Sequence, residues 1–235
     1  MATRISASTA SQLAKANELV NNSLSNADVS TLVAQRGYTT TVLAEGQRHY
    51  NLAVLAVNAQ AAAAGSYTLA TRQATATEKQ AQASFQRLVQ TVRAVFPPNS
   101  AERKTLDVAG PMLKENDAFI GKAITLFGNA HDVVAIALVL ARYGYDEATL
   151  RSEQMQITAF QEALLAQTQA RSAAKRATRA QNEALGALLA WVAQYTKIAR
   201  IALRGQPELL AALGISTARR RATSQNGVVP SNGTP

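Results

Sequence analysis

Four basic residues recur at helical spacing in the second half of the chain, where they could bind phosphate groups. Three of them stand four residues apart, and no acidic residue interrupts the set, which is Arg171, Lys175, Arg176 and Arg179. Such a basic stripe could bind a nucleic acid or an acidic partner. A solvated helix face that keeps an alanine-rich bundle soluble is the alternative, and the absence of interleaved aromatic residues favours it.

The last segment of the chain extends this candidate polyanion-binding set. It contains Arg219, Arg220 and Arg221 and no acidic residue after Ser216. The formal net charge of the whole chain is +9 and its pI is about 10.2. A balance of this kind favours polyanions or acidic partners. The three arginines could bind nucleic acid or anionic lipid, or simply repel like chains.

The two histidines are candidates for metal binding. His49 lies one helical turn after Glu45, and His131 precedes Asp132. Neither belongs to the Glu-x-x-His motif of carboxylate-bridged metal bundles, and a metal site needs three or four convergent ligands. We therefore predict no metal and no other cofactor.

The residues that nucleophilic catalysis would need are missing from the sequence. It contains no cysteine, no nucleophile elbow, no phosphate-binding loop and no dinucleotide fingerprint. The acidic residues are scattered singly, without an obvious acid and base pair. We predict that the protein is not an enzyme and infer no small-molecule substrate.

The composition favours helix throughout. Alanine, glutamine, leucine, threonine and arginine dominate, and aromatic residues make up 5% of the chain. Helical patterns separated by glycine and proline predict an all-α, up-down antiparallel bundle of four main helices, two long and two shorter, plus a short C-terminal helix. We expect the first helical hairpin over 10–96, a linker over 97–111 and a second hairpin with the short helix over 112–214, all within one bundle domain. Residues 1–9 and 215–235 are predicted to be disordered.

Within this plan, helix breaks are predicted at particular residues. The first helix weakens at Asn21–Ser23 and resumes after Asn26 or Asp28, and the third has a weak point at Gly128–Asn129. The second runs without proline from about residue 40 to 96, with Gly65–Ser66 as the place where it would bend.

The two hairpins look like copies of one another at a constant offset in residue number, the offset that takes Gly37 to Gly144. The corner Ala34-Gln-Arg-Gly-Tyr38 matches Ala141-Arg-Tyr-Gly-Tyr145, and the same offset aligns Asn22 with Asn129 and Arg93 with Arg200. Coincidence in an alanine-rich chain is the alternative. A real duplication would give the bundle a pseudo-twofold axis.

Small residues at 3,4 spacing define a predicted packing seam on each long helix. On the fourth helix the seam is Ala163, Ala166, Ala170, Ala173, Ala177, Ala180, Ala184 and Ala187; its counterpart on the second helix is Ala56, Ala59, Ala63, Ser66 and Ala70. Methyl groups at this spacing allow two helices to approach closely.

A stripe of larger apolar residues follows the seam near the end of the fourth helix. Its members are Trp191, Tyr195, Ile198 and Ile201. A stripe of this kind is usually core, and the alternative is a protein interface. Because the long helices outrun the shorter ones, we expect a partner to cover the excess.

The sequence thus favours a non-enzymatic helical scaffold or interaction protein that self-associates through its long helices. The alternatives are a nucleic-acid-associated basic bundle and a reversible binder of membrane surfaces. We expect a cytoplasmic location, because residues 1–10 lack the apolar core of a secretory signal. We do not expect membrane insertion, because the uncharged span from His49 to Thr71 is interrupted by polar residues.

Overall fold

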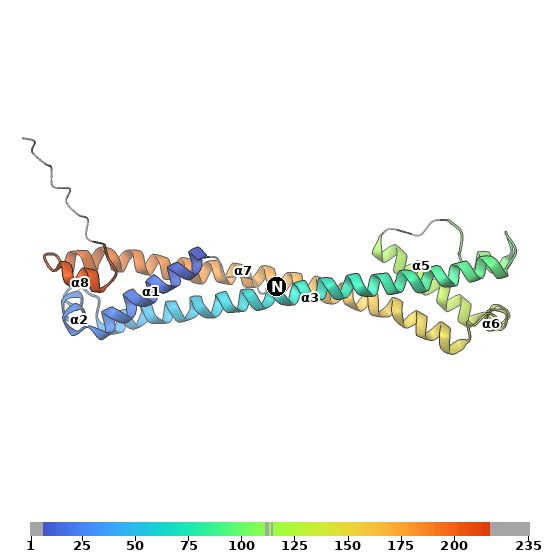
Figure 1. The fold of residues 1–235 in the computed structure, drawn as a ribbon, viewed down its shortest axis with the longest axis horizontal. Helices are drawn as coiled ribbons and strands as arrows, with labels where there is room; N and C mark the ends of the chain where they lie inside the picture. The colour runs from blue at the N-terminus through green and yellow to red at the C-terminus, as the bar shows by residue number, and fades with distance from the viewer. Residues whose placement is uncertain (1–6, 111–112, 114, 217–235) are drawn as a thin grey trace, which may run out of the picture. The chain divides into compact units, whose positions relative to one another are not determined.

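The computed structural model describes residues 7–110, 113 and 115–216, which form eight α-helices and no strand (Figure 1). The prediction of an all-α protein is confirmed for this part of the chain. The helices are α1 (Ala7–Ser25), α2 (Ala27–Ala34), α3 (Thr40–Val95), α4 (Ala101–Thr105), α5 (Asn116–Asp132), α6 (Val134–Ala141), α7 (Glu147–Ala202) and α8 (Pro207–Ala212).

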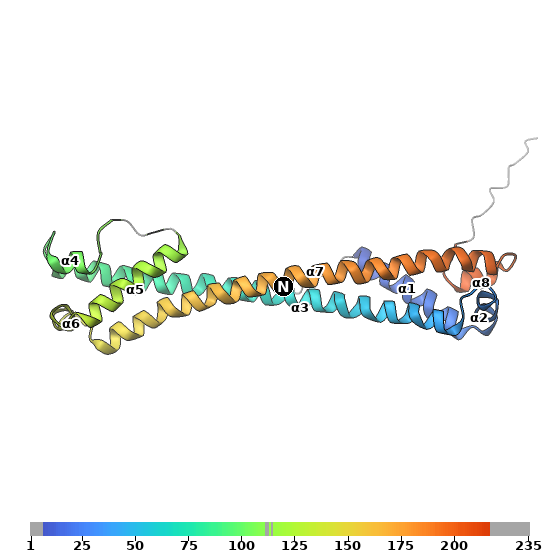
Figure 2. The same cartoon turned by 180° about the vertical axis from the view of Figure 1, so that it is seen from behind.

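Two helices, α3 and α7, are 56 residues long each (Figures 1 and 2). At a rise of 1.5 Å per residue this is about 84 Å of helix. The helix α3 continues through Gly65 and ends just before Pro97, where proline cannot extend the hydrogen-bonded ladder. At the start of α7 the carboxylate of Asp146 accepts a hydrogen bond from the backbone N–H of Thr149 at 2.7 Å, as expected of an N-cap.

The shorter helices are broken, and the breaks follow backbone geometry. The break between α1 and α2 falls at Asn26, whose side chain accepts hydrogen bonds from the N–H groups of Asp28 and Val29. The predicted weak point at Gly128–Asn129 is wrong, because both residues lie inside α5. That helix instead ends at Asp132, Val133 is extended, and α6 leaves at an angle of 87°.

Both corners before the long helices turn at glycine. Gly37 has a φ of 89° and Gly144 a φ of 88°, a left-handed conformation that glycine adopts without strain. The predicted boundaries of the shorter segments shift slightly: α1 begins at Ala7 rather than residue 10, and α5 begins at Asn116 rather than residue 112. Most of the predicted disordered ends, residues 1–6 and 217–235 with Arg219, Arg220 and Arg221, lies outside the described residues.

The described residues divide into two compact units. Unit 1 contains Ala56–Gln181, and unit 2 combines the described residues up to Leu55 with those from Asn182 onward. Each unit therefore takes segments from both halves of the sequence, because α3 and α7 each run through the two units.

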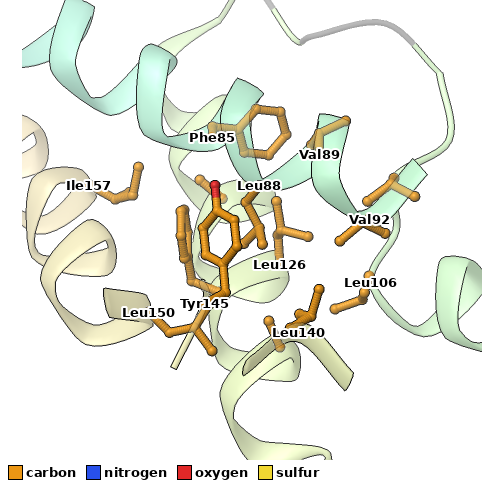
Figure 3. Close-up of a cluster of buried hydrophobic side chains, with 14 of the residues drawn as sticks. Phe85, Leu88, Val89, Val92, Leu106, Leu126, Leu140, Tyr145, Leu150 and Ile157 are labelled. Carbon is orange, nitrogen blue, oxygen red and sulfur yellow. The ribbon is translucent and has the colours of Figure 1, made fainter. Parts of the chain in front are cut away.

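The core of unit 1 packs α5 and α6 against the end of α3 and the start of α7 (Figure 3). Tyr145, the residue after the Gly144 corner, lies among Leu88, Leu126 and Leu150, and Leu106 closes the cluster from the end of α4. Aliphatic and aromatic side chains from α3, α5, α6 and α7 and from the loop after α4 are thus removed from water here, and this burial is the main stabilising term of the unit.

The core of unit 2 takes side chains from α1, α2, α3 and α7 and from the residues after α8. Leu19 of α1, Val33 of α2 and Leu43 of α3 pack with Tyr195 of α7 and with Leu213, which follows α8. The hydroxyl of Tyr195 donates a hydrogen bond to Oγ of Ser23 at 2.6 Å, and Ser23 donates in turn to the carbonyl of Leu19. Both hydroxyls are therefore satisfied although both side chains are buried.

Candidate functional site

The central parts of α3 and α7 in unit 1 hold the sequence features that bear most directly on function. The two helices are in contact there, because Nε2 of Gln167 donates a hydrogen bond to Oγ1 of Thr71 at 3.3 Å. On α3 no residue is buried between Val57 and Ala74, and on α7 none is buried between Ala163 and Leu188. The middle of each long helix is therefore only partly covered, whereas its ends lie in cores.

The alanine seam is split between covered and exposed positions. On α7, Ala163 is buried, Ala170, Ala173, Ala177 and Ala184 are half-buried, and Ala166, Ala180 and Ala187 are exposed. On α3, Ala56, Ala63 and Ala70 are half-buried, and Ala59 and Ser66 are exposed. The half-buried residues at 3,4 spacing on α7 include Ala170, Ala177 and Ala184 of the predicted seam. Alternating with them are Gln167, Ala174 and Gln181, each one residue after a predicted position.

The four residues of the basic stripe, Arg171, Lys175, Arg176 and Arg179, are all exposed. No ion pair within 4 Å joins any of them to an acidic side chain of the described chain. The stretch of α3 that belongs to unit 1 carries no charge from Ala56 to Thr71. The part of α7 near the end of unit 1 thus presents positive charge without a paired acid, an arrangement that can attract anions.

The predicted interface stripe is mostly occupied by contacts within unit 2. The rings of Trp191 and Tyr195 stack at a centroid distance of 5.1 Å, and Tyr38 contacts both, at 6.1 Å and 5.0 Å. Burial raises the pKa of the phenols of Tyr195 and Tyr38. Ile198 is half-buried, and Ile201 is exposed.

Sequence reasoning missed that Trp191 needs a glycine on the facing helix. A Cβ atom placed on Gly46 of α3 would lie 2.4–2.7 Å from three ring atoms of Trp191. The indole therefore packs directly on the backbone of α3. Gly46 lies inside a helix, where glycine is unfavourable, and that unexplained cost is the only sequence signal that could have revealed this contact.

A polar groove of about 640 Å³ occupies unit 1 between α3 and α7. Nη2 of Arg87 donates hydrogen bonds to Oε1 of Glu153 at 2.8 Å and to Oγ of Ser84 at 3.0 Å. The Glu153 side chain is 14% exposed, and its Oε2 is buried without a hydrogen-bond partner among the described residues. The hydrogen bond with Glu153 raises the pKa of Arg87, and burial, followed by the charge of Glu153, raises the pKa of Tyr145.

A charged cluster joins the α5–α6 bend to the start of α7. Nδ1 of His131 lies 2.6 Å from Oδ1 of Asp132, and its Nε2 lies 3.7 Å from Oε1 of Glu147. Glu147 also pairs with Arg151 at 2.7 Å. The pKa of His131 is raised, chiefly by the hydrogen bond with Asp132. Within the part of the chain that the structure describes, no three His, Asp or Glu side chains are placed to hold a metal ion.

Several exposed leucines on α3 were also missed. Leu52, Leu55 and Leu69 are 51%, 64% and 65% exposed. By length and composition α3 also qualifies as a membrane-spanning helix, as does the bent pair α5–α6, and only 11% of the most apolar window of α3 is buried.

The chain matches no protein-family model, and neither the search of curated proteins nor the search of solved structures found a match.

Proposed function

We propose that this protein is a non-enzymatic helical scaffold that self-associates through the central parts of its two long helices. The observation that carries this proposal is the absence of any buried residue between Val57 and Ala74 on α3 and between Ala163 and Leu188 on α7, all of them described residues. Long helices in proteins are stabilised chiefly by tertiary packing, so a long stretch without a core favours a partner.

We further propose that the bundle arose by duplication of a helical hairpin. The offset that takes Gly37 to Gly144 also takes the start of α2 at Ala27 to the start of α6 at Val134, and the start of α3 at Thr40 to the start of α7 at Glu147.

Two equivalent hydrogen bonds support the same proposal. Within unit 2 the side chain of Asn22 donates to the carbonyl of Ala212 at 2.6 Å. Within unit 1 the side chain of Asn129, its counterpart at this offset, donates to the carbonyl of Thr105, also at 2.6 Å. Each asparagine thus connects α1 or α5 to the carbonyl of the last residue of a short helix, which is α8 in unit 2 and α4 in unit 1.

Multi-angle light scattering over a wide range of protein concentration tests the self-association. A single chain has a mass of 24.9 kDa, and we expect the measured mass to rise above this value as the concentration increases. A mass that stays at one chain from micromolar to near-millimolar concentration would remove the proposal. Repeating the series at high salt separates apolar association, which persists, from charge-driven aggregation, which is screened.

Binding of a nucleic acid is a second candidate, favoured by the basic stripe. Arg171, Lys175, Arg176 and Arg179 are exposed, free of ion pairs within the described chain and close to an uncharged stretch of α3. Binding through these residues should weaken steeply with salt, because each phosphate contact releases counterions. Gel retardation of DNA and RNA at low salt is the test, and unretarded nucleic acid at every protein concentration would exclude it.

A further inference from the structure

The outward side of α3 carries a second line of residues at 3,4 spacing, which we call the outer seam. All eight positions are exposed, and they are Leu52, Leu55, Ala59, Ala62, Ser66, Leu69, Gln73 and Ala76. None is charged, and three of them are leucines that are at least half exposed. A 3,4 spacing keeps residues on one side of a helix, and it is the spacing by which two helices interlock.

The outer seam lies on the opposite side of α3 from the residues that this chain itself covers. The buried residues around it are Ala53, Val57 and Ala74, and Thr71 makes the hydrogen bond to α7. At 100° per residue these residues cluster on one side, and the middle of the outer seam lies roughly 150° away. The outer seam is therefore available for a partner after α3 has packed with α7.

We propose that the outer seam pairs with the outer seam of a second copy of this chain, with the two α3 helices antiparallel. This inference rests on the proposed self-association and assigns it a surface. Its basis is the order of residue sizes along the seam, which is self-complementary. In an antiparallel pair centred near Ala64, Leu52 of one copy lies opposite Ala76 of the other, and Leu69 lies opposite Ala59.

The remaining layers are of two other kinds. Leu55 lies opposite Gln73, and the two central layers each place Ala62 opposite Ser66, so no layer places leucine against leucine and the small residues meet only at the centre. A parallel pair would put leucine against leucine and alanine against alanine, which leaves voids at Ala59 and Ala62. Large-against-small packing thus favours the antiparallel arrangement.

The outer seam carries no charge, and this favours a partner surface that is also uncharged, such as the outer seam of a second copy. A neutral seam paired with itself brings no like charges together, whereas an acidic or basic partner would find no counter-charge in it. The seam spans 25 residues, from Leu52 to Ala76, or about 36 Å of helix, so two copies would bury on the order of 800 Å² in total. Because this area is below that of a standard stable interface, the association should be weak and concentration-dependent.

Replacing Leu69 with glutamate tests the surface. Because a carboxylate would have to lose water against Ala59 of the other copy, we expect Leu69→Glu to raise the dissociation constant for self-association at least about tenfold in sedimentation equilibrium. The matched control is Met155→Glu on α7, since Met155 is 62% exposed and lies outside both the outer seam and the uncovered central part of α7. Both variants should keep the wild-type melting temperature, because both positions face water in the single chain.

A mixing experiment tests the orientation. Ala59→Lys alone should also weaken self-association, but a mixture of the Ala59→Lys and Leu69→Glu chains should associate. An antiparallel pair then places the introduced lysine of one chain opposite the introduced glutamate of the other and keeps the second such layer unchanged. A parallel pair would place neither charge opposite the other. Failure of the mixture to associate more strongly than either variant alone would overturn the antiparallel pairing.

The outcomes separate this inference from the proposal on which it rests. If the wild-type chain self-associates and Leu69→Glu and Met155→Glu behave alike, the outer seam is not the interface, although the scaffold proposal stands. If the wild-type chain never self-associates, both fail. If Leu69→Glu abolishes co-sedimentation with vesicles of phosphatidylcholine and phosphatidylserine while self-association is unchanged, the seam contacts a membrane surface and the inference is overturned.

Discussion

In unit 2, Trp191 of α7 packs on the backbone of Gly46 of α3. At the corresponding positions of unit 1, related by the offset that takes Gly37 to Gly144, α3 carries Ser84 and α7 carries Glu153. There the polar groove replaces the indole, and Arg87 connects the two side chains through hydrogen bonds. One unit thus fixes the approach of α3 and α7 with an aromatic side chain and the other with a charge pair.

Because the two units differ here, the packing of α3 against α7 does not require one kind of contact. Both units have a glycine corner and a tyrosine directly after it. Both also have an asparagine whose side chain donates to the last carbonyl of a short helix, α4 in unit 1 and α8 in unit 2. These shared contacts surround the point where the two units differ. We infer that they define the arrangement, while the residues at Gly46 and Glu153 determine how much each unit is stabilised.

Removing the indole should produce the largest change. Trp191→Ala leaves a void above Gly46, and we expect unit 2 to lose about 3 kcal/mol of unfolding free energy. Hydrogen exchange should then accelerate in α1 and α2 and remain unchanged in α5 and α6. The matched variant Ser84→Ala in unit 1 removes a buried hydroxyl that accepts one hydrogen bond from Arg87, and we expect a smaller loss of about 0.5–1.5 kcal/mol. Equal losses for the two variants would show that the units do not differ as described.

Replacing Gly46 should change the free energy of unfolding with a sign that depends on whether the Trp191 indole is present. Gly46→Ala places a Cβ atom against the Trp191 ring, and we expect a loss of about 1–3 kcal/mol from overpacking. In the Trp191→Ala background the same change should stabilise the helix by up to about 1 kcal/mol, because alanine is the better helix former. A double-mutant cycle measured by urea unfolding gives both values, and an unchanged sign would contradict the contact.

Breaking the charge pair in unit 1 should have a smaller effect. Arg87→Ala leaves a carboxylate that is only 14% exposed without its cation, and we expect a loss of about 1–2 kcal/mol. Glu153→Gln should cost less, because Arg87 is 57% exposed and can be solvated. Gln194, at the corresponding position of unit 2, is the control, and Gln194→Ala should be nearly neutral in thermal unfolding.

A pH change should give the smallest effect, again confined to unit 1. Asp132 and Glu147 raise the pKa of His131, and Arg151 opposes them. Because the folded pKa lies above the ordinary value of 6.5, this contribution to stability is complete below about pH 6.5 and is lost as the pH rises through the raised pKa. Exchange at the α5–α6 bend, corrected for the intrinsic pH dependence, should therefore increase from pH 6 to 8. Unit 2 is the internal control, since Leu24 occupies the position corresponding to His131.

The element plan could be predicted from the sequence because strong local signals mark it. Helices end at glycine and proline in this chain. Gly37 and Gly144 adopt a left-handed backbone conformation, and the proline pair after α3 cannot continue its hydrogen bonds. The α5–α6 break has no such signal. A cluster of apolar residues on both sides of Val133, including Phe127, Ala130 and Ile136, decides it through burial in the unit 1 core.

The register of the long helices was harder to predict, because alanine has little preference between core and surface. Large residues at the ends, such as Phe160 and Leu188 on α7, are fully buried and determine which side turns inward. Counting from them gives Gln167, Ala174 and Gln181 as the half-buried line, whereas counting alanines alone gave Ala166, Ala180 and Ala187, which are exposed. The contact of Trp191 with Gly46 joins residues far apart in sequence, and no local pattern predicts it.

Hydrogen exchange measured at several protein concentrations tests most directly whether a second copy covers the long helices. We predict that amides between Leu52 and Ala76 of α3 become more protected as the concentration of the full chain rises, while the cores of both units keep constant protection. Protection along α3 that is independent of concentration would contradict the proposal that self-association covers this helix.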